Sequence, residues 1–210
     1  RIIGRRFKLV HVFYGDHIIE TATFRREPDR EADGRNGTDD LLITEDNEYG
    51  TAAEDARRRD FTINGLFLDP DTTPVGSKRK SSPRIIDFVG GLEDLEAGVL
   101  RTIGDPQVRF AEDTVRILRA VKFATRLGFR IEDKTWDAMC ELAPDLERSS
   151  RPRVLEELLR LFRSGTALGA FRMLRACGAL RVLLPSLDDY LEAPGGVSST
   201  NDATHAESFW

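Results

Sequence analysis

Cysteine is scarce in this sequence, and its placement marks neither a metal site nor a disulfide-rich fold. Cys140 and Cys177 are the two cysteines among 210 residues, and both lie in apolar segments of helical periodicity. Isolated cysteines of this kind usually act as small buried hydrophobes, and these two form no zinc-binding pattern. A disulfide between them is the alternative, although no other feature indicates a secreted scaffold. We therefore expect a reducing, cytoplasmic location.

Long hydrophobic runs and a net positive charge are absent as well. No apolar run approaches the ~20 residues that cross a bilayer, so we expect no membrane partner. The residues are 40% hydrophobic and 32% charged, as in a globular protein, and the formal net charge is -5. Such a chain does not bind nucleic acid through bulk positive charge. Local basic clusters remain at Arg5, Arg6 and Lys8, at 57–59 and at 78–84.

The part of the sequence before Gly90-Gly91 mixes strand and helix patterns. Runs of β-branched and aromatic residues predict extended segments at 7–13, 18–24, 61–68 and 85–88. Gly15-Asp16 separates the first two runs and predicts a hairpin. Early acidic and late basic residues predict a helix over 52–58. Polar composition predicts loops at 26–50 and 69–84.

The part after Gly91 is helical in pattern. Apolar residues recur at helical spacing over 112–127, and Gly128 is placed to end that helix. The pattern predicts further helices at 133–143, 152–164 and 167–177. On the side of the first helix opposite its apolar face we expect four charged residues, Glu112, Asp113, Arg116 and Arg119.

A first group of polar residues stands at the entrance to the predicted strand 61–68. Arg58, Arg59 and Asp60 precede this strand, and Asn64 lies on it. Guanidinium groups bind phosphates, and a carboxylate can accept a hydrogen bond from a ribose hydroxyl or join a metal shell. The triplet alone is also typical of a salt-bridged strand edge. Nucleotide binding and simple ion pairing are therefore both open at this point.

A second group lies at the start of the predicted helix 112–127. Asp113 is three residues before Arg116 and Glu112 is four before it, so on one helix their side chains would be neighbours. Adenine presents an exocyclic amine donor beside a ring-nitrogen acceptor. A carboxylate beside a guanidinium offers the complementary acceptor and donor, so such a pair can select the incoming base. A surface ion pair is the alternative.

The two groups, in this order, resemble motifs of a known enzyme family. The stretch 58–64 matches the pattern RRDFTxN, 86–95 resembles a hinge between head and neck, and 101–124 resembles a base-selecting helix. By this resemblance the chain is identified as a member of the class II tRNA nucleotidyltransferase and bacterial poly(A) polymerase family, within the polymerase β-like superfamily. The resemblance runs from about Arg1 to Pro185. Thr114, where relatives usually carry Pro, and Gly65 are mild departures.

The resemblance implies an α+β fold with three parts. It implies the C-terminal part of a nucleotidyltransferase head with a mixed sheet in 1–88, an all-helical neck in 89–150 and the start of a helical RNA-binding body in 151–210. Implied nucleotide-binding residues are Arg58, Arg59, Asp60, Asn64, Glu112, Asp113, Arg116 and Arg119. Implied catalytic residues are Asp60 and Glu20. We assign RNA binding to the basic residues Arg5, Arg6, Lys8 and Arg25.

Magnesium is the implied cofactor, but its expected aspartate pair is not found in this sequence. The chain starts at Arg1 without Met and runs directly into a strand pattern. We therefore expect the aspartate pair and a Gly-Gly phosphate-binding turn before Arg1, and we expect the segment by itself to be inactive. Asp69-Pro70-Asp71 has Asp-x-Asp spacing, but it lies in a Pro-rich loop without that turn, so we interpret it as chance.

The implied reaction is template-independent polyadenylation, in which AMP is transferred from ATP to RNA 3′ ends. Within the family, the opening stretch 2–12 resembles the segment that separates bacterial poly(A) polymerases from CCA-adding enzymes. Two alternatives stay open. The first is CCA addition to tRNA, which shares every motif after residue 58, and the second is a non-catalytic RNA-binding relative.

Overall fold

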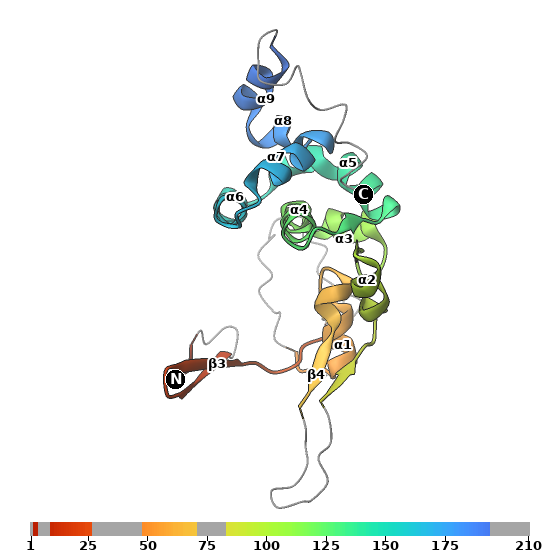
Figure 1. Ribbon diagram of the computed structural model, residues 1–210, viewed down its shortest axis with the longest axis vertical. Coiled ribbons are helices and arrows are strands. Elements are labelled where there is room, and N and C mark those ends of the chain that lie inside the picture. Colours follow the sequence, from red (N-terminus) through yellow and green to blue (C-terminus); the bar gives the residue numbers. More distant parts are fainter. Residues whose placement is uncertain (1, 4–8, 27–47, 71–82, 194–210) are drawn as a thin grey trace, which may run out of the picture. The chain divides into compact units, whose positions relative to one another are not determined.

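A computed structural model describes residues 2–3, 9–26, 48–70 and 83–193 of the chain. These residues form two units, Arg1–Arg59 and Asp60–Trp210, and each has its own elements (Figure 1). The predicted domains 1–88, 89–150 and 151–210 rest on the family resemblance and not on compactness, so they stay a prediction. Among the described helices, none has both the length and the apolar character needed to span a lipid bilayer.

The first unit contains a three-stranded antiparallel sheet in the order β1–β2–β3. Its strands are β1 (Ile2–Ile3), β2 (Leu9–Tyr14) and β3 (His17–Thr21). The pairing of β2 with β3 ends at Tyr14 and His17, and Gly15 in the turn between them has a φ of 57°. Glycine adopts this left-handed conformation without strain. The predicted hairpin is confirmed.

Helix α1, Ala52–Arg57, is the other regular element among the described residues of the first unit. Thr51 Oγ1 accepts a hydrogen bond from the Glu54 N–H at 3.3 Å, and Glu54 Oε2 accepts one from the Thr51 N–H at 2.7 Å. This capping box satisfies two amides at the start of the helix. The hydrogen bonds from the Thr51 backbone and side chain lower the pKa of Glu54. The helix predicted for 52–58 is confirmed.

The described residues at the start of the second unit form four short elements. They are a 3-10 helix η1 (Thr62–Gly65), strands β4 (Phe67–Asp69) and β5 (Arg84–Ile86), and helix α2 (Gly91–Ala97). β4 and β5 pair antiparallel. The strand predicted for 61–68 is wrong over 62–65, where the Asn64 N–H donates to the Phe61 carbonyl at 2.9 Å and closes a turn.

A close approach of two backbones explains why this strand prediction was wrong. A Cβ atom on Gly91 would lie 2.2 Å from the carbonyl oxygen of Thr62, so only glycine lets α2 begin against η1. Gly90 before it has a φ of 77°, which glycine also tolerates best. Packing of α2 on η1 therefore outweighs the strand propensity of the local sequence.

Most of the second unit is helical, as predicted. Its remaining helices are α3 (Pro106–Glu112), α4 (Val115–Leu127), α5 (Asp133–Leu142), the 3-10 segment η2 (Ala143–Arg148), α6 (Arg151–Arg163), α7 (Ala167–Ala176), α8 (Ala179–Leu183) and α9 (Pro185–Glu192). Gly128, with a φ of 68°, ends α4 as expected. A parallel pair of short strands, β6 (Val99–Leu100) and β7 (Arg130–Ile131), had no clear signal in the sequence.

The helix predicted for 112–127 is divided near its start. α3 ends at Glu112, Asp113 has an extended backbone (φ −155°, ψ 92°), and α4 begins at Val115. Asp113 Oδ1 accepts from the Val115 N–H at 3.3 Å, a local bond that competes with helix formation. The expectation that Glu112 and Asp113 lie on the same helix as Arg116 and Arg119 is therefore wrong.

α4 lies in the core of the second unit. It packs against α3, α6 and α7 (Figure 1), and its buried residues are Val115, Ile117, Leu118, Ala120, Val121 and Ala124. Phe61 is completely buried and meets Phe123 of α4 edge to face, with ring centroids 5.9 Å apart. Truncating a buried Phe to Ala typically destabilises a protein by about 3–5 kcal/mol. Phe61 therefore anchors the residue before it, Asp60.

The two cysteines are free thiols. Burial raises the pKa of Cys177 to about 11. A thiol with so high a pKa carries little thiolate at neutral pH, and the thiolate is the nucleophile and the metal ligand. Cys177 therefore serves as part of the hydrophobic core, in line with the interpretation from the sequence.

Candidate nucleotide-binding site

Asp60 is a buried carboxylate held between two arginines of α4. Its side chain is 11% exposed. Oδ1 accepts from Arg116 Nε at 3.0 Å, and Oδ2 pairs with Arg119 Nη2 at 2.6 Å. The Asp60 carbonyl accepts from the Ile103 N–H at 3.1 Å, which fixes the backbone. The structure therefore joins the two charged groups that the sequence separates by more than fifty residues.

Arg116 is also bound from its other side by the end of α3. Its Nη1 donates to the carbonyl oxygen of Arg109 at 2.6 Å and to Glu112 Oε2 at 3.1 Å. Glu112 Oε2 accepts in addition from Arg109 Nη1 at 2.9 Å. Among the described residues only Nε and Nη1 of Arg116 have acceptors, so Nη2 is available to a ligand. The guanidinium is thus held in one orientation with a donor left over.

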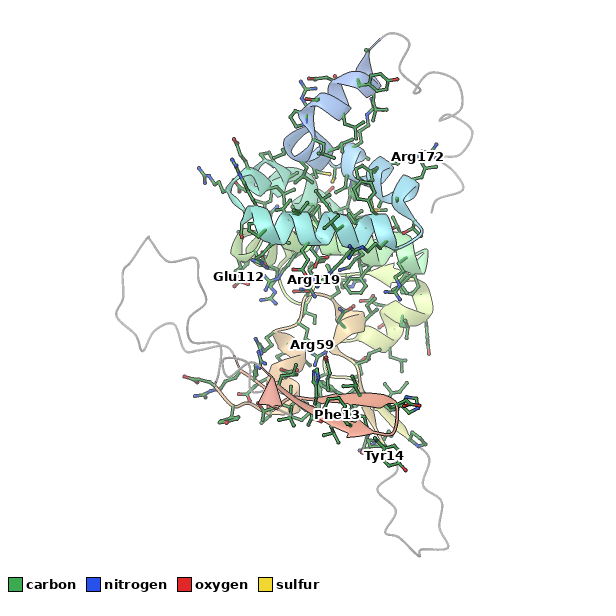
Figure 2. All side chains as sticks on the ribbon, turned by 90° about the vertical axis from the view of Figure 1, so that its left-hand side faces the viewer. Phe13, Tyr14, Arg59, Glu112, Arg119 and Arg172 are labelled. Carbon is green, nitrogen blue, oxygen red and sulfur yellow. The ribbon has the colours of Figure 1, made fainter. Side chains whose placement is uncertain are left out.

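Arg119 lies one turn further along α4 and contributes a second partly used guanidinium. Its side chain is 36% exposed, so it can meet a solute. Its Nε is buried and has no hydrogen-bond partner among the described residues. Figure 2 shows Arg119 and Glu112 along the same edge of the helical part of this unit. We call Asp60, Arg109, Glu112, Arg116 and Arg119 the Asp60 cluster. It combines guanidinium groups held in place by ion pairs with a side chain, Arg119, that is partly exposed to solvent.

Asp113 does not pair with Arg116 through its side chain. Asp113 Oδ2 binds Arg153 Nη2 of α6 at 2.6 Å, and the contact to Arg116 is a backbone one, from the Arg116 N–H to the Asp113 carbonyl at 3.0 Å. The expected neighbourhood of the Asp113 and Arg116 side chains is therefore wrong in this structure. The cause is the extended backbone at Asp113, which turns its side chain to another helix.

Arg58 and Arg59 lie in the first unit, and both contact Asp55 of α1. Arg59 donates to Asp55 Oδ2 through Nε at 3.1 Å and Nη2 at 2.8 Å, and Arg58 Nη1 lies 3.7 Å from Asp55 Oδ1. The Arg59 side chain is 42% exposed. Both residues are thus ordered, and the predicted role in nucleotide binding stays a prediction. Asn64 is half-buried in η1 instead of lying on a strand, and its predicted role is likewise untested.

The remaining predicted residues belong to the first unit. Glu20 on β3 has an exposed carboxylate whose Oε1 lies 3.1 Å from Nε2 of His11 on β2. The Arg25 N–H donates to Asp55 Oδ1 at 3.2 Å, which ties the segment after β3 to α1. Three predicted RNA-binding residues lie outside the described residues: Arg5, Arg6 and Lys8.

Two arginines that bind predicted site residues were not themselves predicted from the sequence. Arg109 is 7% exposed and binds Glu112, and Arg153 binds Asp113. The spacing of Arg109 three residues before Glu112 was a usable signal, because such residues are neighbours on a helix. Arg153 lies forty positions after Asp113, and no local pattern indicated that contact.

The described residues do not fit a magnesium site. No three His, Cys, Asp or Glu side chains gather so that they could hold a metal ion in the described part of the chain. Asp60 lies between two guanidinium groups, and further positive charge beside them would be repelled. In this structure the Asp60 carboxylate therefore pairs with Arg116 and Arg119.

Two family models match the chain on either side of α4. The model described as "Poly A polymerase head domain" matches residues 1–101, and "Probable RNA and SrmB- binding site of polymerase A" matches 128–191. The chain belongs to the class II family of poly(A) polymerases and CCA-adding enzymes. The residues between the ranges that the two family models match include α3 and α4. These two helices supply Arg109, Glu112, Arg116 and Arg119.

Individual relatives within the class II family agree with this membership. Poly(A) polymerase I of Salmonella typhi is 39% identical over 93% of this chain and 40% of that protein. A CCA-adding enzyme of Oceanobacillus iheyensis is 34% identical over 76% of this chain and 36% of that protein. The chain thus spans about two fifths of the length of the curated relatives it matches.

A solved structure supports the fold assignment. The crystal structure of a tRNA nucleotidyltransferase complexed with a primer tRNA and an incoming ATP analog matches with a TM-score of 0.69 and 27% identity. The match covers 90% of this chain and 50% of that one. The predicted fold class, a partial nucleotidyltransferase head followed by a helical neck, is therefore confirmed.

Proposed function

We propose that the protein containing this chain transfers AMP from ATP to RNA 3′-hydroxyls without a template. The observation that carries the proposal is the Asp60 carboxylate paired with Arg116 and Arg119, with Nη2 of Arg116 left for a ligand. The longer and more similar match to the poly(A) polymerase I of Salmonella typhi supports adenylate addition over CCA addition. RNA 3′ ends and ATP are the proposed partners, in the cytoplasm.

Asp60 is proposed to bind the ribose. An ionised carboxylate has about four lone-pair sites; Oδ1 of Asp60 accepts one hydrogen bond from Arg116, and Oδ2 forms an ion pair with Arg119. Asp60 can therefore accept a further bond from a ribose hydroxyl without releasing Arg116 or Arg119. The same carboxylate then links the position of the sugar to the position of the arginine that would contact the base.

Arg116 is proposed to read the adenine base. Its free Nη2 donor suits a ring nitrogen of the base, and its two used nitrogens hold the plane of the guanidinium fixed. Asp113 Oδ2 is already bound to Arg153, so Asp113 would accept from the exocyclic amine beside that contact. In the described arrangement Arg116 is therefore the main discriminating group, and Asp113 is secondary.

The phosphates and the RNA are assigned to other parts of the chain. Arg59 directly precedes Asp60 in sequence, and with Arg58 it is proposed to bind the triphosphate while Asp55 restrains both side chains. Glu20 is proposed as a further carboxylate of the active site, with the magnesium ions on residues other than Asp60. The helical segment 128–191 is proposed to hold the RNA, in accordance with the family model that matches it.

CCA addition is the second candidate function, because CCA-adding enzymes are among the relatives. The test uses the full-length protein with an RNA primer, a tRNA without its CCA end, and each nucleoside triphosphate supplied separately. We expect long adenylate tracts on the RNA primer and negligible use of CTP. Efficient incorporation of CTP into the tRNA would support CCA addition instead, and no incorporation of any nucleotide would support a non-catalytic relative.

A pair of matched variants links this test to the site. Asp60→Asn should reduce adenylate incorporation by about 100-fold, because the sugar and both arginines lose their carboxylate anchor. Asp16→Asn changes the same chemical group in the exposed turn of the hairpin and should leave incorporation unchanged. Equal activity of the two variants would contradict the role proposed for Asp60.

A further inference from the structure

A buried hydroxyl two residues after Asp60 ties the site to the start of the neck. Thr62 Oγ1 donates to Asp94 Oδ2 of α2 at 2.7 Å. Thr62 is 3% exposed and Asp94 is 6% exposed, so this bond is shielded from water. The Thr62 N–H also donates to the Arg101 carbonyl at 3.0 Å. Thr62 is therefore fixed through its backbone and its side chain at once.

Arg101 extends this contact to α5. Its Nε donates to both oxygens of Asp94 at 3.2 and 3.1 Å, and its Nη1 donates to Glu132 Oε1 at 3.3 Å. The other oxygen of Glu132 accepts from the N–H and the hydroxyl of Thr135, both at 2.8 Å. The hydrogen bond to Asp94 raises the pKa of Arg101, so its charge is permanent. A continuous polar chain thus runs from Thr62 to the first turn of α5.

We propose that Asp94 and Arg101 are positioning residues for nucleotide recognition, and that they act through Thr62 on Asp60. The backbone from Asp60 to Thr62 lies against 101–103, and Thr62 cannot shift without moving Asp60. Asp60 pairs with Arg119 at 2.6 Å and with Arg116 at 3.0 Å, and the attraction in such charged pairs weakens when the partners move apart. This inference rests on the proposed function, in which Asp60 holds the ribose.

A purely structural role would have a different signature from a positioning role. A buried ion pair that only stabilises the fold would, when broken, lower activity toward every nucleotide alike. A pair that positions Asp60 would change how well the enzyme distinguishes ATP from 2′-deoxyATP, because that distinction depends on a contact to the ribose hydroxyl. The ratio of kcat/KM for the two nucleotides is therefore the decisive measurement.

The central variant is Thr62→Val in the full-length protein. Valine keeps the shape of threonine and removes the donor to Asp94. We expect the ATP over 2′-deoxyATP ratio to fall by about 10-fold, since hydrogen bonds to charged groups have effects of this size. Thr62→Ser, which restores the hydroxyl, should return the ratio to within about threefold of the original protein.

Thr102→Val is the matched control. Thr102 is 4% exposed and adjoins the same backbone pairing, but its Oγ1 has no hydrogen-bond partner among the described residues. This variant should leave the nucleotide ratio unchanged. Arg101→Lys is a second variant for the case in which Thr62→Val does not fold. Lysine keeps the charge but lacks the planar fork, so the ratio should fall by roughly threefold or more.

Asp60→Ala separates this inference from the proposed function. If Asp60→Ala lowers the nucleotide ratio whereas folded Thr62→Val and Arg101→Lys leave it unchanged, the positioning inference is overturned and the ribose role of Asp60 stands. If Asp60→Ala leaves the ratio unchanged, the ribose role fails and the inference fails with it. Folding of each variant is checked by thermal unfolding.

Discussion

Asp55 and Asp60 each bind two arginines, but they find their partners in different ways. Asp55 lies in α1 and binds Arg58 and Arg59, which follow it at i+3 and i+4. Side chains at these spacings are neighbours on any helix. The arginine pairs of the Asp55 cluster are therefore local in sequence, although Asp55 Oδ1 also accepts a hydrogen bond from the more distant Arg25 N–H at 3.2 Å.

The Asp60 cluster is long-range. Its partners Arg116 and Arg119 lie on α4, and Phe61, the residue after Asp60, is buried against Phe123 of that helix. In both clusters one aspartate pairs with two arginines, but the two clusters indicate different things about the structure. A local cluster reports helix formation, whereas a long-range cluster depends on the packing of the second unit and is where a ligand can be recognised with fixed geometry.

The largest effect that separates the two clusters should come from removing their carboxylates. Asp60→Ala removes the carboxylate that pairs with Arg119 and one of the two carboxylates that pair with Arg116, and it should lower the free energy of unfolding by about 3 kcal/mol. Asp55→Ala removes helix-spaced pairs and one backbone hydrogen bond, so about 1.5 kcal/mol is expected. Chemical denaturation of the full-length variants measures both values. Equal losses would remove the distinction between local and long-range clusters.

The next effect concerns the arginines of the long-range cluster. Arg116→Ala should lower the preference for ATP over CTP by about 30-fold or more, because its fixed guanidinium is the proposed reader of the base. Arg119→Ala is the matched control on the same helix, with the same partner Asp60. It should weaken use of both nucleotides and change their ratio far less. Kinetics with each nucleotide separates the two outcomes, and similar ratios would contradict the role of Arg116.

Packing behind the long-range cluster can be disturbed without touching a charge. Gly91→Ala places a Cβ atom against the Thr62 carbonyl and should destabilise the protein by about 1–3 kcal/mol. Gly169→Ala is the control, because its Cβ would meet only Thr125 Cγ2 at an ordinary 3.8 Å, inside a helix that favours Ala. Thermal unfolding should show a lower Tm for the first variant and an unchanged or higher Tm for the second. The opposite order would sink the packing argument.

A smaller effect is expected at the ion pair between Asp113 and Arg153. The Arg153 side chain is 53% exposed, and exposed pairs contribute about 0–1 kcal/mol to stability. Asp113→Ala should therefore change the ATP to CTP preference by no more than about threefold, and unfolding should be nearly unaffected. A change as large as that of Arg116→Ala would mean that Asp113 leaves Arg153 and contacts the base.

The smallest effect is a pH dependence of stability at Asp87, which accepts hydrogen bonds from nearby backbone N–H groups. Burial raises the pKa of Asp87, but hydrogen bonds from the N–H groups of 89–92 outweigh it and lower the pKa overall. The folded pKa lies below the unfolded value, so the stabilisation is present above the unfolded pKa and is lost as pH falls through the folded one. Asp87→Asn should lose less Tm than the original protein between neutral and strongly acidic pH. An equal fall in Tm for the two proteins would count against this stabilising role of the Asp87 carboxylate.

The sequence located most elements because their signals are local. The hairpin around Gly15, the capped helix α1 and the end of α4 at Gly128 follow from turn chemistry, capping and periodicity. Prediction from the sequence failed where contacts between distant segments determine the local structure. The backbone approach of Gly91 to Thr62 turned a predicted strand into η1, and the parallel pair β6 and β7 had too few residues to leave a pattern.

The candidate site shows the same division. The identity of the charged residues was read from the sequence, including Asp60, Arg116 and Arg119. Only part of their pairing was, because Glu112 does pair with Arg116 at the predicted i, i+4 spacing, at 3.1 Å. Helix spacing predicted Asp113 beside Arg116, whereas the structure gives Arg116 to Asp60 and gives Asp113 to Arg153. A single extended residue between α3 and α4 was enough to exchange the partners.

By itself, then, the sequence determined which segments are helical, which carry charge, and which enzyme family the chain resembles. Tertiary structure decided which charges from distant segments of the chain meet. The physical reason is that capping and periodicity act over one or two turns, whereas partners such as Asp60 and Arg116 are brought together by burial of apolar side chains from distant segments. Local chemistry supplies the groups, and the packing of Phe61 against α4 selects the pairs.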